Sequence, residues 1–365
     1  MESNFVYTQP VEIHFGRGQF AHLAEILAAR GLRRGVIVCG RHFAPKAQEL
    51  LEANIGVCAV FSDIKEEPQL SGVAEAARLA GAHGADCVIG IGGGSAMDTA
   101  KFAAAIALEQ EDALAYFNGE RPFPAAHLPI LAVPTTSGTG SEVTQVSVIS
   151  HGSTKRTINN PVFMPSVAIV DPDLSDTVPA RIVMCTGLDA LAHALEGYWS
   201  RNHQPISDLM AVEAVGIIWE NLERAYRHPD DREAHASMAY AAMLGGLSFA
   251  LPKTAACHAC SYPLCEHFHI SHGEACAFTL DSFVRINADE RLEKLCRKAG
   301  IGDTERLARR IGEWKEMAGL RTRLSQLGDT APEQLARESA VHPLMNNNPV
   351  AMDEAALTKM FEVLR

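Results

Sequence analysis

The sequence predicts two consecutive domains of different class: an α/β domain with a parallel sheet, followed by a domain built of helices alone. Up to about Pro179, short apolar runs alternate with stretches of helical spacing, which is typical of a parallel sheet covered on both faces. Beyond that point the apolar positions keep only helical spacing. Asp-Pro at 171–172 and Val-Pro at 178–179 interrupt the chain, which places the boundary near 173–182, and we expect domains 1–178 and 179–365.

The elements follow from local patterns. In the first domain, apolar runs bounded by turn residues predict strands at 36–38, 57–61, 87–91, 129–133 and 167–170. Amphipathic or Ala-rich spacing predicts helices at 46–53, 70–84 and 96–108, and a polar loop then runs to Ala126. In the second domain the same spacing predicts helices at 185–198, 205–226, 231–249, 255–268 and 274–286, with further helices to Leu364.

Composition excludes several classes of protein. The 365 residues include 32 Lys and Arg against 44 Asp and Glu, a net charge of −12, which disfavours nucleic acid and anionic membranes as partners. No apolar run approaches the roughly 18–20 residues of a membrane helix, and the N-terminus lacks the pattern of a signal peptide. Most of the nine cysteines lie in apolar stretches, so we expect reduced thiols and a cytoplasmic protein.

A glycine-rich loop follows the strand at 87–91 and opens the next helix. Glycines at this point allow a phosphate to approach the backbone, and a helix N-terminus supplies N–H donors. The strict G-x-G-x-x-G pattern fails because Ser95 occupies its last position, so a plain tight turn is the alternative. The candidate cofactor contacts in this segment are Gly92, Gly93, Gly94, Ser95 and Asp98.

A second loop of small residues, 134–142, follows the strand at 129–133. It offers the hydroxyls of Thr135, Thr136 and Ser137 together with many backbone donors, although it also fits an ordinary loop. Ligands of open α/β sheets bind at the carboxyl ends of the strands. Two such loops at one sheet edge therefore favour nucleotide or phosphate binding.

The second domain carries a candidate metal-binding set. Asp189 and His193 are four residues apart, so they share one face of a helix, and their flanking residues are apolar, unlike those of a surface ion pair. Four histidines cluster downstream; His258 and His272 lie at helix starts, whereas we expect the two between them, at 267 and 269, to be exposed. Three histidines and one carboxylate suit Fe(II), Zn or Mn.

These motifs together resemble the iron-containing (group III) alcohol dehydrogenases. The matching segments cover nearly the whole chain: VEIHFGRG at 11–18, GGGSAMDTAK at 92–101, PTTSGTGSE at 134–142, DPDL at 171–174, D-x3-H at 189–193, and His258 followed by His272-Gly273. The resemblance implies a dinucleotide-binding domain and a helical domain of the dehydroquinate synthase-like type, with the active site in the cleft between them. It also implies a homodimer or a larger homo-oligomer.

The resemblance further assigns roles to residues. Asp189, His193, His258 and His272 would hold the metal, the two loops would bind NAD or NADP, and Lys155 would lie beside the nicotinamide ribose. The implied reaction is the reversible reduction of a short aldehyde to a primary alcohol. In it, the metal polarises the carbonyl oxygen and the nicotinamide delivers hydride.

Two positions depart from the family pattern. Tyr262 stands where many members have a second histidine that relays protons; its hydroxyl or water would replace that relay, or the ring simply packs. Gly40 and Arg41 stand where NAD-preferring members often have an acidic residue. Nothing there repels a 2′-phosphate, so we expect NADPH to be tolerated unless Arg41 is merely an exposed side chain.

The stretch 254–287, with Ser-Tyr-Pro after His258, resembles the subgroup that reduces phosphonoacetaldehyde. An anionic substrate in an acidic protein needs local cations, and Lys155, Arg156 and Lys253 are candidates unless they are simply solvated. Sulfoacetaldehyde, succinic semialdehyde and neutral aldehydes are the alternative substrates. Three other readings are a lyase resembling dehydroquinate synthase, a metal-free reductase resembling maleylacetate reductase, and a non-catalytic binding protein.

Overall fold

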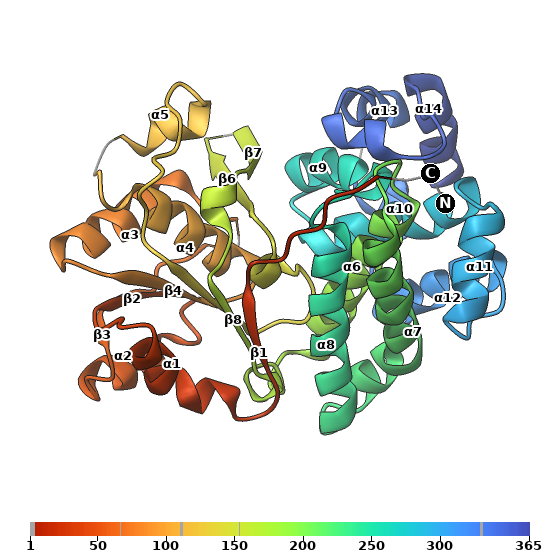
Figure 1. The fold of residues 1–365 in the computed structure, drawn as a ribbon. Helices are drawn as coiled ribbons and strands as arrows, with labels where there is room; N and C mark the ends of the chain where they lie inside the picture. Colours follow the sequence, from red (N-terminus) through yellow and green to blue (C-terminus); the bar gives the residue numbers. More distant parts are fainter. Residues whose placement is uncertain (1–3, 66, 110–111, 153, 329–330) are drawn as a thin grey trace. The chain divides into compact units, whose positions relative to one another are not determined.

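The computed structural model describes residues 4–65, 67–109, 112–152, 154–328 and 331–365, which form two compact units (Figure 1). The α/β unit comprises Thr8–Thr136 and Gly140–Ser175. The helical unit comprises Asp176–Arg365, the short segment Ser137–Thr139 and the described residues 4–7. The sequence-based division after residue 178 lies a few residues beyond the division at Ser175.

The α/β unit is organised around one parallel sheet, as the sequence predicts. Its strand order within the described chain is β1-β8-β5-β4-β2-β3, and each neighbouring pair is parallel. The apolar runs form these strands because both faces of the sheet are covered by helices. The strands are β1 (Glu12–Phe15), β2 (Gly35–Cys39), β3 (Val57–Phe61), β4 (Cys87–Gly92), β5 (Ile130–Pro134) and β8 (Val167–Val170).

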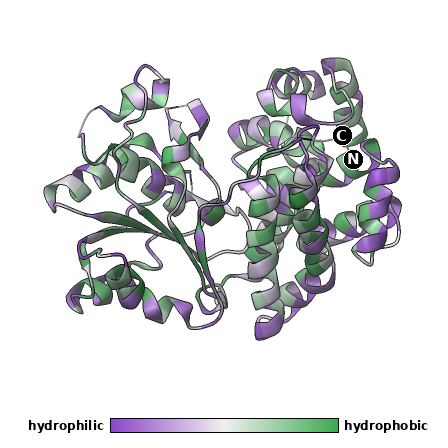
Figure 2. Cartoon of the chain, in the orientation of Figure 1, coloured by the Kyte–Doolittle hydropathy of each residue, from purple (hydrophilic) through white to green (hydrophobic). Residues whose placement is uncertain are grey.

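Each face of the sheet buries a separate hydrophobic core. Helices α1 (Leu23–Ala29) and α2 (Ala44–Glu52) pack on the face that includes Ile37 and Ile89. On the opposite face, helices α3 (Leu70–Ala82), α4 (Gly94–Ile106) and α5 (Ala113–Asn118) cover the side chains of Val38 and Val88. Figure 2 shows the hydrophobic colouring of the sheet strands between more hydrophilic outer helices.

Two elements of this unit do not follow from the apolar pattern. The antiparallel hairpin of β6 (Val146–His151) and β7 (Thr154–Asn159) occupies a stretch for which the sequence analysis predicted no element. Strand β7 has no buried position, so it lacks the apolar run by which the other strands were found. Helix α5 lies inside the predicted polar loop. This short helix is stabilised at its N-terminus by Asp112, whose side chain accepts a hydrogen bond from the backbone N–H of Leu114.

The helical unit is centred on α6 (Ala180–Trp199), which is buried almost throughout its second half. Gly197 allows α6 to pack closely against α8 (Arg232–Phe249), because a Cβ at this position would lie only 2.9 Å from the carbonyl oxygen of Ser248. None of the helices in the described residues is both long and apolar enough to cross a membrane. The remaining helices are α7 (Pro205–Arg227), α8 (Arg232–Phe249), α9 (Ala256–Phe268), α10 (His272–Ile286), α11 (Glu290–Lys298), α12 (Thr304–Met317), α13 (Pro332–Ala340) and α14 (Glu354–Val363).

Candidate functional site

The helical unit brings the four predicted metal ligands together. Asp189 and His193 lie one turn apart on α6, His258 is on α9, and His272 is the first residue of α10. The Nε2 atoms of His258 and His193 are 3.0 Å apart. Asp189 Oδ1 lies 3.7 Å from Nε2 of His258 and 3.8 Å from Nε2 of His272. The four side chains therefore converge on one small volume.

Glycines allow the helices to approach closely enough to form this cluster. A Cβ at Gly273 would lie 2.4 Å from the carbonyl oxygen of Cys185, so only glycine permits the start of α10 to rest on α6. Gly245 of α8 is similarly close to α6, because its Cβ would lie 3.2 Å from the carbonyl oxygen of Ala190. The Gly after His272 thus positions the imidazole beside Asp189.

The donor set fits a divalent cation. Asp189 Oδ1 is buried and has no hydrogen-bond partner among the residues that the structure describes. Burial alone would raise the pKa of Asp189, but the neighbouring rings of His193, His272 and His258 hold it below its ordinary value. Burial lowers the pKa of His193 to about 4, so this imidazole is neutral and has a nitrogen lone pair available at neutral pH. A buried carboxylate with neutral imidazoles is a typical site for Fe(II), Zn or Mn.

Glu196 supports the cluster and was missed by the sequence analysis. Its buried carboxylate accepts hydrogen bonds from Nδ1 of His258 and from the backbone N–H of Cys257, the latter at 2.6 Å. Burial opposes protonation of His258, but the charge of Glu196 raises the pKa of that ring. The signal was available, because residues 189, 193 and 196 share one helical face at spacings of four and three.

Tyr262 lies on α9, one turn after His258, and its ring stacks on His342 with centroids 4.3 Å apart. The sequence analysis missed His342, which precedes the short helix η6 (Pro343–Asn347) far along the chain. Burial, and secondarily the charge of His258, lower the pKa of His342. An imidazole thus lies beside Tyr262, whose part in proton relay stays a prediction.

A thiol also belongs to the cluster. Cys276 Sγ lies 3.6 Å from Nε2 of His272, and Asp189, His258, His272 and Cys276 all present donor atoms within 4.8 Å of one another. Burial, with the nearby Asp189 charge, raises the pKa of Cys276 well above its ordinary value. Cys257 and Cys260, which form a C-x-x-C sequence on α9, are also buried free thiols, and neither belongs to this set of donor atoms.

The α/β unit brings the two predicted cofactor loops side by side. Thr135 donates its backbone N–H to the carbonyl of Gly92 at 3.0 Å, and a Cβ on Gly93 would meet Thr136 Oγ1 at 3.4 Å. Gly92 has φ +151°, and its Cβ would collide with that of Ala96 at 2.8 Å, so the loop requires glycine there. Gly40 follows β2 at the same edge of the sheet, and its backbone nitrogen would lie 4.0 Å from a Cβ at Gly92. This edge is where open α/β sheets bind nucleotides.

Asp98 has a different environment from the other predicted cofactor residues. It is buried, and its oxygens accept hydrogen bonds from Ser141 Oγ at 2.7 Å and from the Val148 backbone N–H at 2.8 Å. Lys101 Nζ donates to the same Ser141 hydroxyl at 2.6 Å. The charge of Lys101 also partly offsets the effect of burial, which raises the pKa of Glu142. Asp98 therefore connects α4 to the second loop and to β6, and its contact with a cofactor stays a prediction.

The predicted cations already have partners in the protein. Lys155 pairs with Glu67 at 3.0 Å, and Arg156 donates to the carbonyl of Phe117 at 2.5 Å. Arg41 is exposed and pairs with Asp63 at 2.7 Å. Lys253 differs from these three cations in its location, because it lies in the helical unit just after α8. Its side chain donates a hydrogen bond to the Ala250 carbonyl at 2.7 Å.

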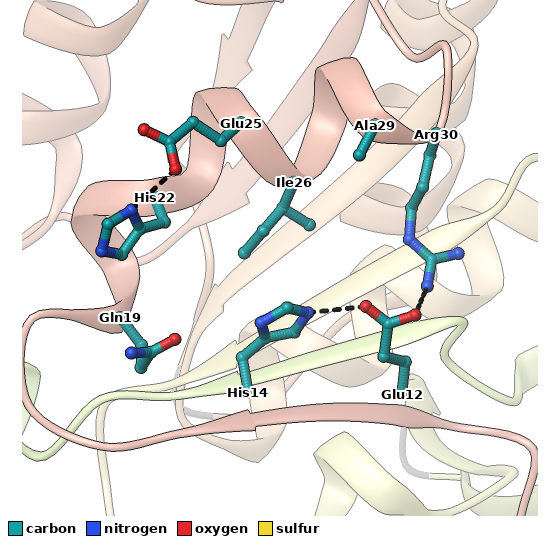
Figure 3. A pocket seen from close by; sticks show the side chains of 8 residues that line it. All are labelled: Glu12, His14, Gln19, His22, Glu25, Ile26, Ala29 and Arg30. Atoms are coloured by element: carbon teal, nitrogen blue, oxygen red, sulfur yellow. Dashed lines mark hydrogen bonds and ion pairs between the residues drawn. The ribbon is translucent and has the colours of Figure 1, made fainter.

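A surface hollow of about 510 Å³ between β1 and α1 is separate from all of these residues (Figure 3). Its charged side chains are bonded to one another: Glu12 to His14 at 2.7 Å and to Arg30 at 2.5 Å, and His22 to Glu25 at 2.8 Å. No predicted site residue lines it. The hollow therefore adds nothing to the candidate site.

Comparison with known proteins identifies the chain. Residues 10–172 match the family model described as iron-containing alcohol dehydrogenase, and residues 183–364 match the model of the C-terminal part of the same family. The chain belongs to the iron-containing alcohol dehydrogenase family. It is accordingly a nicotinamide-dependent oxidoreductase of aldehydes and alcohols, and the α/β plus helical fold predicted from the sequence is confirmed.

Three relatives within this iron-containing family are informative. The chain is 35% identical to long-chain-alcohol dehydrogenase 1 of Geobacillus thermodenitrificans, over 83% of this chain and 81% of that protein. It is 31% identical to a sulfoacetaldehyde reductase of Bilophila wadsworthia, over 83% of each. It is also 40% identical to the sulfoacetaldehyde reductase of Bifidobacterium kashiwanohense, solved in complex with NAD+, over 99% of both chains with a TM-score of 0.95.

Proposed function

We propose that this protein reduces a short anionic aldehyde of the sulfoacetaldehyde type to its alcohol, with a nicotinamide cofactor and one divalent metal ion. The observation that carries the substrate class is the 40% identity, over 99% of both chains, to a sulfoacetaldehyde reductase. The same comparisons favour a sulfonate over the phosphonate that the motif at 254–287 suggested. In the reaction, the carbonyl carbon gains hydride, the oxygen gains a proton, and the nicotinamide is oxidised.

Asp189, His193, His258 and His272 would hold the metal ion, and the buried, unpartnered Oδ1 of Asp189 supports that assignment. Bound there, a divalent cation polarises a carbonyl oxygen and stabilises the negative charge that develops on it. Glu196 orients the His258 ring through Nδ1, and Phe249 stacks on His193 with centroids 4.3 Å apart. These contacts fix the donors before any ligand arrives.

The loops after β4 and β5 would bind the pyrophosphate of NAD or NADP, with Gly92 and Gly93 letting it approach the N-terminus of α4. Gly94, Ser95, Thr135, Thr136 and Ser137 would contribute further contacts, and Lys155 would approach the nicotinamide ribose. The sequence-based expectation of an active site between the two domains stays a prediction. So do the homo-oligomer and the cytoplasmic location.

Lys253 would bind the anionic group of the substrate. It follows α8, whose last residue, Phe249, stacks on the predicted ligand His193, and the Lys253 backbone N–H donates to the Phe249 carbonyl at 2.8 Å. Its side chain makes a single neutral hydrogen bond, to Ala250, and no carboxylate pairs with it in the described residues. These contacts support Lys253 as the cation that would bind the anionic group, on the segment that follows the predicted metal ligands.

The experiment follows nicotinamide absorbance with Fe(II)-loaded enzyme, NADH and NADPH being tested separately. The substrates are sulfoacetaldehyde, phosphonoacetaldehyde, succinic semialdehyde, glycolaldehyde and propanal. We expect the highest kcat/KM with sulfoacetaldehyde, and a Lys253→Gln variant that raises KM for the anionic aldehydes while leaving propanal unchanged. Equal activity on neutral aldehydes would reject the anionic substrate, and full activity of His258→Ala or His272→Ala would reject the metal site.

A further inference from the structure

A thiol lies inside the cluster of predicted metal ligands. Helix α10 starts at His272, and Cys276 is one turn further along, so both side chains project from the same face. The sulfur lies 3.6 Å from Nε2 of His272, and the donor atoms of Asp189, His258, His272 and Cys276 all fall within 4.8 Å of one another. Cys276 itself is fully buried.

The spacings match the edges of a coordination polyhedron. Metal–nitrogen and metal–oxygen bonds of about 2.1 Å and metal–sulfur bonds of about 2.3 Å place neighbouring ligand atoms about 3.0–3.6 Å apart in four- and five-coordinate sites. The corresponding separations here are 3.6 Å from Cys276 to His272, and 3.7 and 3.8 Å from Asp189 Oδ1 to His258 and His272. A single cation could therefore contact this set with small adjustments of the side chains.

A second, independent observation points into the same volume. Asp189 Oδ1 is buried near Nε2 of both His258 and His272, and no group in the described part of the chain forms a hydrogen bond with it. A buried carboxylate oxygen without a partner is costly unless a cation binds it. One oxygen of the Asp189 carboxylate lies within 4.8 Å of the thiol, so a cation bound by this carboxylate is within reach of the sulfur.

We propose that Cys276 is a further ligand of the divalent cation, and that its thiolate favours zinc and cobalt over manganese. The inference rests on the proposed metal site and adds a soft donor to it. On binding, the S–H bond breaks, the proton leaves to solvent, and the sulfur lone pair forms the bond to the cation; no electron is transferred. Thiolate ligands select zinc over manganese, which prefers carboxylate and water oxygens.

Cobalt(II) gives a readout that does not depend on activity. The full-length protein is freed of metal with a chelator and titrated with Co²⁺, and its visible and near-ultraviolet spectra are recorded. We expect ligand-field bands together with a sulfur-to-cobalt charge-transfer band. Cys276→Ala should lose the charge-transfer band and keep the ligand-field bands. The matched control is Cys296→Ala, a buried cysteine of α11 outside the cluster, which should keep both.

Metal affinity supplies the second measurement. By chelator competition, Cys276→Ala should weaken zinc binding by about 10–100-fold, the range found when a supporting group of a metal site is removed, and change manganese binding much less. Ligand-field bands without a charge-transfer band in the unmodified protein would overturn the role of Cys276 and leave the proposed function intact. If no cobalt bands of either kind form, both the metal site and the inference are rejected.

Discussion

Glu196 holds His258 at two points: its carboxylate accepts a hydrogen bond from the ring Nδ1, and its other oxygen accepts one from the His258 backbone N–H at 3.4 Å. A hydrogen on Nδ1 leaves Nε2 with its lone pair directed at the cluster, where it lies 3.7 Å from Asp189 Oδ1. One carboxylate therefore sets both the orientation and the tautomer of a predicted ligand.

Replacing that carboxylate tests its role. In Glu196→Gln, an amide N–H would face Nδ1 and favour the opposite tautomer, so we expect metal affinity to fall by about 10–100-fold while the fold is retained. Chelator competition measures the affinity, and circular dichroism checks the fold. The control is Glu266→Gln, an exposed position on α9. Unchanged affinity in Glu196→Gln would show that the ring is oriented by packing alone.

The tyrosine at the relay position and its stacked imidazole form a second test. If Tyr262 or His342 moves a proton to the developing alcohol, Tyr262→Phe and His342→Gln should each lower kcat by about 100–10,000-fold, the range of general acid–base catalysis. The pH–rate profile should lose one limb in the variant that removes the proton donor. His267→Gln, which breaks a bond to Glu338 on the outer part of α9, is the control. Unaltered profiles in both variants would mean that Tyr262 only packs.

Cofactor choice is testable at the end of β2. A Cβ at Gly40 meets nothing within 4 Å, so Gly40→Asp introduces a carboxylate without a collision. We expect this change to favour NADH over NADPH by about tenfold or more, because it accepts hydrogen bonds from the ribose hydroxyls and repels a 2′-phosphate. Arg41→Ala should also weaken NADPH binding. A constant ratio of kcat/KM for the two cofactors would show that this loop does not read the ribose.

The buried Glu142 predicts a pH dependence of stability in the α/β unit. Burial raises its pKa from an ordinary 4.5 to about 7, so the folded chain holds the proton more tightly than the unfolded chain. The stabilisation that comes from this tighter proton binding is fully present below about pH 4.5 and is lost as the pH rises through about 7. Glu142→Gln cannot ionise, so its Tm relative to the unmodified protein should rise between about pH 5 and about pH 8. Glu75→Gln, exposed on α3, should show no such trend.

The sequence predicted the elements whose pattern is governed by burial. Strand β3 and strand β8 were located at their observed bounds, because a strand covered on both faces is apolar along its whole length. The hairpin of β6 and β7 was not predicted because β7 has no fully buried position and therefore no apolar run. The hairpin is stabilised by pairs of residues on its two strands, and the spacing of apolar residues along one strand does not reveal such pairs.

The same distinction applies to the site. The sequence could propose Asp189, His193 and His272 as ligands because they lie in short motifs, D-x3-H and His-Gly, and this assignment stays a prediction. The sequence analysis missed Glu196 and Cys276, although each lies about one helical turn after a predicted ligand, His193 on α6 and His272 on α10. His342 was beyond reach of any local pattern, since its neighbour Tyr262 is eighty residues earlier in the chain and only the fold brings their rings together.

Helix α6 carries Asp189, His193 and Glu196 within two consecutive turns, all buried in the helical unit. Three groups of the cluster are therefore ordered by the folding of a single rigid segment, independently of any ion. In zinc fingers, by contrast, the ion itself drives folding. The chain should accordingly retain its helix content after complete demetallation and take up its ion late, from whichever metal pool the cell supplies once the polypeptide is complete.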